Sequence, residues 1–157
     1  MLQMLTLVAL VLSPVQRPTD VVKWSAEAVP ATAAGGAAVS IKVNAQVQSG
    51  WKLYAIEQAE GGPKPLSFAT AKGSPFQIVS KRIVAPPSKL QKQDENFALD
   101  TRYYENGAAF AIPVTVARQV PAGIHEIPLE VTFQACGAEL CLRPFTQKLP
   151  VRISIAR

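Results

Sequence analysis

Residues 39–47 read Val-Ser-Ile-Lys-Val-Asn-Ala-Gln-Val, with apolar and polar side chains in alternation. Successive side chains of a β-strand point to opposite faces, so this stretch predicts a strand that buries one face and solvates the other. Residues 108–116, 127–133 and 149–155 repeat the pattern. The sequence therefore predicts an all-β fold built from half-buried strands.

Shorter apolar runs add further candidate strands. These are residues 21–26, 51–54, 66–69 and 76–84. Turn-forming Gly, Pro and Asn residues separate the candidates, and no amphipathic helical pattern is present. About eight short strands with such punctuation predict an antiparallel β-sandwich of the immunoglobulin type. Pro113 has no backbone N–H to donate, so it predicts an edge strand or a bulge at that position.

Two polar segments interrupt the strand pattern, residues 57–65 and residues 85–103. We expect both to be loops. A loop as long as the second one is usually functional or mobile. It contains Phe97, an aromatic residue among charged ones. Phe97 either serves the function of the loop or packs against the sandwich.

The composition fits one globular domain, which we expect over residues 20–157. Of the 157 residues, 48% are apolar and only 17% are charged, so a wholly disordered chain is not expected. The net charge is +5. Its Lys and Arg residues are scattered rather than gathered on one element, so we do not expect a nucleic-acid partner.

The N-terminus carries an unbroken apolar segment from Leu5 to Leu12. It is too short to span a bilayer as a helix but suits the apolar region of a secretory signal. We therefore expect a signal peptide over residues 1–16, although no basic residue precedes the apolar segment; a buried N-terminal strand is the alternative. No later segment is long and apolar enough to span a membrane, so we expect no stable span in the mature chain.

The chain has two cysteines, Cys136 and Cys141, on either side of a turn that contains Gly137. In an exported protein such a pair is expected to form a disulfide. Because a loop this small yields only about 2 kcal/mol of entropic stabilisation, a redox role is favoured over a local structural bridge. Cys136 has the parity of Thr132 and Gln134, which predicts that it lies on the solvated face.

Metal binding and hydrolysis are the weaker interpretations of the cysteines. Zinc prefers four ligands, and His125 is the one histidine of the chain. Copper(I) could accept two thiolates alone, and a nucleophilic thiol would need a base beside it. We expect neither a metal nor a cofactor.

Residues 133–136 (Phe-Gln-Ala-Cys) and 141–144 (Cys-Leu-Arg-Pro) resemble the active-site hairpin of the N-terminal periplasmic domain of DsbD, the bacterial thiol:disulfide interchange protein. Residues 50–54 (Gly-Trp-Lys-Leu-Tyr) resemble an early strand of that family. Residues 94–97 (Asp-Glu-Asn-Phe) resemble its acidic-aromatic cap loop, with Asn96 as an additional residue before the aromatic one. The resemblance covers about residues 20–157 and implies an immunoglobulin-like fold.

The resemblance also implies a function, a periplasmic thiol–disulfide oxidoreductase of the protein-disulfide reductase type. Family members receive electrons from a thioredoxin-like domain fed by a membrane-embedded relay. They pass these electrons to disulfide isomerases or to thioredoxins of cytochrome c maturation. No relay follows in this chain, so we expect a separate DsbD-like membrane relay or thioredoxin-like protein to reduce it. A non-catalytic immunoglobulin-like interaction module with a local disulfide is the alternative.

The resemblance assigns roles to residues of this chain. Cys136 and Cys141 form the redox pair, and Phe97 shields their disulfide until a partner docks. Asp94, Glu95 and Tyr54 surround the site, and a carboxylate there disfavours a thiolate. Cys141 is expected to be the sulfur attacked by the partner, with Cys136 resolving. Strand parity alone favours the reverse assignment.

Overall fold

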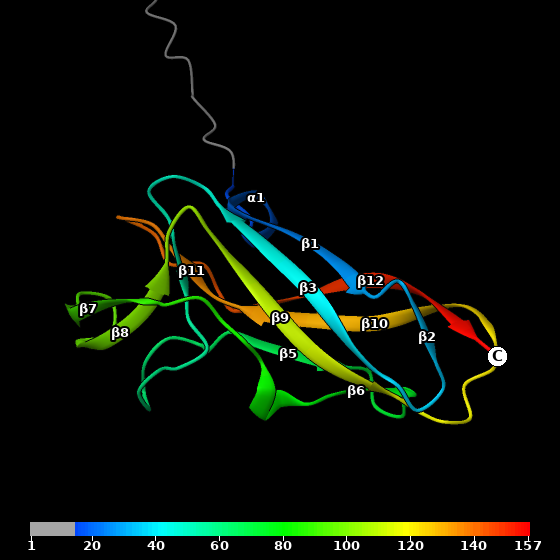
Figure 1. Cartoon of the computed structure of the whole chain (residues 1–157). Coiled ribbons are helices and arrows are strands. Elements are labelled where there is room, and N and C mark those ends of the chain that lie inside the picture. Colours follow the sequence, from blue (N-terminus) through cyan, green and yellow to red (C-terminus); the bar gives the residue numbers. More distant parts are fainter. Residues whose placement is uncertain (1–14) are drawn as a thin grey trace, which may run out of the picture.

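The computed structural model describes residues 15–157, so the apolar segment at the N-terminus lies outside the described residues. The described chain is almost entirely β-structure (Figure 1). Its helices are the four-residue α1 and a short 3₁₀ turn. Within this part of the chain, no helix is long and apolar enough to cross a membrane.

The elements follow one another along the chain in this order. They are α1 (Pro18–Val21), β1 (Val22–Val29), β2 (Thr32–Ala34), β3 (Ala38–Val47), β4 (Lys52–Tyr54), β5 (Ser67–Thr70), β6 (Phe76–Ile78), the 3₁₀ turn η1 (Ser80–Arg82), β7 (Lys89–Asp94), β8 (Leu99–Tyr104), β9 (Gly107–Val116), β10 (Gly123–Phe133), β11 (Ala135–Cys136) and β12 (Phe145–Ala156).

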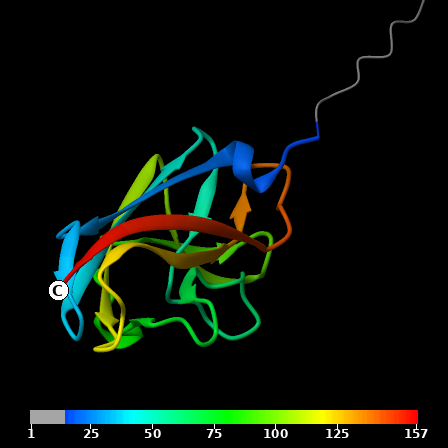
Figure 2. The same cartoon turned by 90° about the vertical axis from the view of Figure 1, so that its right-hand side faces the viewer.

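The strands form three four-stranded sheets. The first sheet has the order β1-β3-β9-β6, the second β2-β12-β10-β5 and the third β11-β4-β8-β7. All pairs are antiparallel except β2 with β12. The first two sheets form the sandwich, and the third lies at one end of it, far from the C-terminus (Figures 1 and 2). The predicted immunoglobulin-like antiparallel sandwich is confirmed.

The core follows the alternation seen in the sequence. Ile41 and Val43 of β3 are 0% exposed, as are Ile112 and Val114 of β9. Opposite them, β10 contributes residues 127, 129, 131 and 133, all 0% exposed. Because each strand places every second side chain between the two sheets, the apolar positions meet in one core.

The prediction of a loop over residues 85–103 is wrong. Residues 89–94 and 99–104 pair as the hairpin β7–β8, with an irregular register between Gln91 and Asp94. Its strands bury few apolar side chains, and this irregularity breaks the two-residue period, so the sequence shows no alternation. The predicted strand over residues 76–84 is also too long, since it ends at Ile78 and η1 follows.

Pro113 lies in β9, an interior strand of the first sheet, and pairs in unbroken register with Ser40 of β3, so the prediction of an edge strand or a bulge is wrong. Its carbonyl accepts a hydrogen bond from the Val79 N–H, beyond the end of β6 at Ile78. The N and C=O of one strand residue face the same side. The Pro113 nitrogen therefore faces Val79, which lies beyond the last residue of β6, so the absent N–H removes no hydrogen bond between named strands.

Candidate functional site

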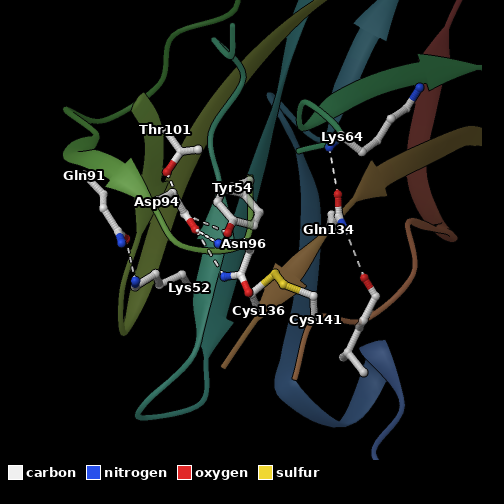
Figure 3. Close-up of a disulfide and its surroundings, with 11 residues drawn as sticks. Lys52, Tyr54, Lys64, Gln91, Asp94, Asn96, Thr101, Gln134, Cys136 and Cys141 are labelled. Carbon is white, nitrogen blue, oxygen red and sulfur yellow. Dashed lines mark hydrogen bonds between the residues drawn. A yellow bond between two sulfur atoms is a disulfide. The ribbon is translucent and has the colours of Figure 1, made fainter. Parts of the chain in front are cut away.

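The two cysteines lie in a short hairpin at one edge of the third sheet. Strand β10 ends at Phe133, and β11 then pairs with β4. Cys136 and Cys141 form a disulfide with their Cα atoms 4.1 Å apart (Figure 3). We call residues 135–142 the cysteine hairpin. The N–H of Gly137 donates to the carbonyl of Leu140 (2.8 Å), so the hairpin is closed by backbone pairing as well as by sulfur.

The two sulfur-bearing residues differ in exposure. Cys136 is 1% exposed, whereas Cys141 is only partly buried. The prediction from parity that Cys136 lies on the solvated face is wrong. Gln134 belongs to neither β10 nor β11, so the alternation of β10 stops before the cysteine. Ala135 and Cys136 are both buried, one on each face of the third sheet.

Strand register places Cys136 on a defined face of the third sheet. Cys136 pairs directly with Lys52, and Tyr54 pairs directly with Tyr103. Directly paired residues of antiparallel strands point to the same face, and so do residues two apart in one strand. These four residues therefore share one face, which we call the cysteine face. Tyr54 and Cys136 are buried, yet neither belongs to the apolar core cluster.

Asp94 organises the neighbouring part of the cysteine face. Its carboxylate is 0% exposed and accepts hydrogen bonds from the Tyr54 hydroxyl (3.0 Å) and the Thr101 hydroxyl (2.8 Å). The backbone and side-chain amides of Asn96 also donate to it, at 3.0 and 3.1 Å. Figure 3 shows these groups converging on the carboxylate.

These contacts act on two pKa values in opposite directions. Burial raises the pKa of the Asp94 carboxyl, but the hydrogen bonds from Asn96, Thr101 and Tyr54 outweigh burial and lower this pKa below its ordinary value. Burial, followed by the hydrogen bond to Asp94 and its charge, raises the pKa of Tyr54 well above its ordinary value. At neutral pH the pair is therefore a carboxylate held by a phenol.

The segment that resembles a cap loop, residues 94–97, contacts Tyr54 through both Asp94 and Phe97. The ring of Phe97 packs edge-on against the ring of Tyr54, with 5.5 Å between centroids. Phe97 is half-buried, and its backbone N–H donates to the carbonyl of Asp94. Glu95 is exposed in the turn between β7 and β8. The structure thus brings Tyr54, Asp94 and Phe97 together and leaves Glu95 at the surface.

Sequence reasoning missed a second contact across the cysteine face. The ammonium of Lys52 lies 5.2 Å from the ring centroid of Tyr103 and donates a hydrogen bond to the side-chain oxygen of Gln91. Lys52 thereby reaches from the strand beside Cys136 across β8 to β7. The sequence did hold a signal for this contact. Lys52 lies two residues before Tyr54 in a predicted strand, so the two side chains must share a face.

A hollow of about 630 Å³ lies beside Cys141. Its lining is mainly apolar and includes Leu140, Pro144, Phe145 and Val15 of the N-terminal segment, together with the polar Gln16 and Arg143. Leu140 is 50% exposed. An incoming molecule would therefore reach Cys141 past an apolar rim.

Nothing in the described residues groups three or more potential metal-ligating His, Cys, Asp or Glu side chains. His125 lies near the start of β10, whereas the cysteine hairpin follows the end of that strand. One ring nitrogen of His125 is 2.7 Å from the carbonyl of Pro121. It is therefore not brought to the cysteines.

Fold and site together define an immunoglobulin-like β-domain that carries a disulfide in a short hairpin at one end of the sandwich. Residues 22–152 match the model of the family described as thiol:disulfide interchange protein DsbD, N-terminal. The chain belongs to this family. It matches none of the curated protein sequences with which it was compared.

One solved structure shows a similar fold, and a second gives a weaker match. The N-terminal periplasmic domain of ScsB from Proteus mirabilis superposes with a TM-score of 0.52 at 17% identity, over 86% of this chain and 49% of that one. This chain therefore spans about half the length of that structure. A chain of a type I cohesin–dockerin complex from Clostridium thermocellum matches over 87% of this chain and 99% of its own length, at 12% identity and a TM-score of 0.43.

Proposed function

We propose that this protein carries out thiol–disulfide exchange in the periplasm through Cys136 and Cys141. The observation that carries the proposal is the asymmetry of the disulfide, in which a partly exposed Cys141 is bonded to a buried Cys136. Exchange requires one sulfur that a foreign thiolate can reach, and a resolving thiol held next to it. Membership of the DsbD N-terminal family supports the same function.

The reaction balances with a dithiol protein as the reductant. A thiolate of that protein attacks the Cys141 sulfur, which breaks the disulfide and releases the Cys136 thiolate. The second thiolate of the reductant then attacks its own mixed-disulfide sulfur and releases the Cys141 thiolate. The reductant leaves as a disulfide, and two electrons have passed to this protein, with two protons taken up by the thiolates. We propose a thioredoxin-like protein or a DsbD-like membrane relay as the reductant.

The cap-loop residues have a shielding role in this proposal. Phe97 packs on Tyr54 above the cysteine face, and Asp94 fixes the base of the same loop. An aromatic ring in this place would exclude small thiols and oxidants and yield to a docked protein. Glu95 is exposed, so it would act by charge on an approaching partner rather than by direct contact within the loop.

The reduction potential of the Cys136–Cys141 pair tests the function directly. An exchange protein has a potential in the range of known periplasmic redox proteins, whereas a structural disulfide lies below about −300 mV. A value below that limit would favour the alternative, an immunoglobulin-like interaction module with a local disulfide.

Trapping tests the roles of the two sulfurs. The Cys136→Ser variant, mixed with a partner protein in its disulfide form, should accumulate a mixed disulfide through Cys141. The Cys141 thiolate attacks the partner's disulfide and releases one partner thiolate, and no Cys136 thiol is present to resolve the product. The Cys141→Ser variant should accumulate none, since Cys136 is 1% exposed. Trapping by the Cys141→Ser variant alone would reverse the assignment.

A further inference from the structure

Gln134 occupies the break between β10 and β11, and its side-chain amide contacts two other segments. The amide nitrogen donates to the carbonyl of Leu142 (3.2 Å), the residue after Cys141. The amide oxygen accepts from the backbone N–H of Lys64 (2.8 Å). Its backbone carbonyl also accepts from the N–H of Tyr54 (3.2 Å). Figure 3 shows the side chain between Lys64 and the segment that carries Cys141. We call residues 141–144 the Cys141 arm.

The arm after the turn is held by the burial of Leu142 in the apolar core cluster and by few hydrogen bonds. Cys141 is the second residue of an isolated bridge with Cys136, and no named strand includes residues 137–144. In the described residues, the other hydrogen bonds across the hairpin run from Gly137 N–H to the Leu140 carbonyl and from Leu142 N–H to the Ala135 carbonyl. Gln134 therefore supplies the hydrogen bond that ties the arm to the rest of the domain beyond the hairpin itself.

We infer that Gln134 is a positioning residue that holds the Cys141 arm in place when the disulfide is reduced. This inference rests on the proposed function and adds a residue to it. In the oxidised protein the disulfide already restrains the arm. In the dithiol form that restraint is gone, and the Gln134 amide keeps Cys141 beside Cys136. The two thiols then close again at a high effective concentration.

The expected consequence is a shift in the redox equilibrium. Removing the Gln134 contact frees the arm more in the reduced state than in the oxidised state, so the dithiol becomes the more favoured form. One side-chain hydrogen bond corresponds to a change of about three- to tenfold in an equilibrium constant. The contact is present in the oxidised protein as well, so Gln134→Leu should lower the equilibrium constant for disulfide formation against a reference dithiol by up to about that factor, where tenfold corresponds to about 30 mV.

A second variant separates the two hydrogen bonds of the amide. In Gln134→Glu, a carboxylate can still accept from the Lys64 N–H but has no N–H to donate to the Leu142 carbonyl. It should shift the equilibrium as much as Gln134→Leu or more. In both variants the Leu142 amide of the reduced protein should exchange with solvent faster than in the reduced wild type.

Gln58 provides the matched control. It is another glutamine whose side-chain amide bonds to backbone groups, and these groups lie outside the cysteine hairpin. Its amide nitrogen donates to the carbonyls of Ala55 (3.2 Å) and Arg102 (2.6 Å). Gln58→Leu should leave the redox equilibrium unchanged. Equal shifts in Gln58→Leu and Gln134→Leu, or no shift in either Gln134 variant, would overturn the inference. A wild-type potential below about −300 mV would instead count against the proposed function.

Discussion

The body of the sandwich and its third sheet are held together in different ways. The long strands of the body, β3, β9, β10 and β12, have 10 to 12 residues and pack apolar side chains between the first two sheets. The third sheet has strands of two to six residues. In the described chain, the buried polar residues Asp94 and Thr101 both belong to the third sheet.

This difference matches the tasks of the two regions. Burial of apolar surface is non-directional and summed over many contacts, so the body has no single contact whose loss opens it. In the third sheet, particular side-chain pairs such as Tyr54 with Asp94 connect neighbouring segments. Such pairs can break one at a time. We therefore expect the region that carries the Cys136–Cys141 disulfide to rearrange more readily than the body.

The largest effect on stability is expected from the body. Ile112→Ala removes a side chain that is 0% exposed at the centre of the sandwich and should lower the free energy of unfolding by about 2–5 kcal/mol. Urea denaturation of the oxidised protein measures this loss. Ile124→Ala is the control, since Ile124 is 78% exposed and should change stability by about 0.5 kcal/mol or less. Equal losses in the two variants would contradict the comparison.

A smaller effect, dependent on pH, is expected from the Asp94 group. Tyr54→Phe removes one donor to the carboxylate and should cost about 1.5–3 kcal/mol at pH 7. The folded-state pKa of Asp94 is lowered, so its contribution is present above the unfolded pKa of about 4 and is lost as the pH falls through the folded pKa. The difference in unfolding free energy between wild type and variant should therefore shrink as the pH falls through the folded-state pKa of Asp94.

The control for this prediction is another tyrosine of the same sheet. Tyr103 makes no hydrogen bond through its hydroxyl within the described residues. Tyr103→Phe should change stability little across the same pH range. A loss in Tyr54→Phe that does not shrink as the pH falls through the folded-state pKa of Asp94 would show that Asp94 is not the group responsible.

The smallest effect on stability is expected from the cap loop, although its effect on reactivity should be clear. Phe97→Ala removes an aromatic contact with Tyr54 and should cost about 0.5–1.5 kcal/mol. The same change should speed reduction of the Cys136–Cys141 disulfide by dithiothreitol, because the aromatic ring proposed to shield the disulfide is removed. Leu90→Ala is the control, since Leu90 is 48% exposed on the same hairpin but on the opposite face. An unchanged reduction rate in Phe97→Ala would contradict the proposal that Phe97 shields the disulfide.

Much of the body could be predicted because its signal is local. The alternation in residues 39–47 and 127–133 specifies which side chains are buried without reference to any partner strand. The β7–β8 hairpin could not be predicted in this way. Two of its three buried residues, Asp94 and Thr101, are polar, and their burial depends on hydrogen bonds to each other and from Tyr54, which is distant in sequence.

The candidate site divides along the same line. The sequence determined that two cysteines five residues apart flank a glycine-containing turn, which brings them within reach of each other. Only the tertiary structure decided that Cys136 is buried and Cys141 partly exposed. Gln134 interrupts the strand before Cys136, and its partners Lys64 and Leu142 lie 70 and 8 residues away. A two-residue period continues only while a strand continues, and contacts between distant segments decide where this strand stops.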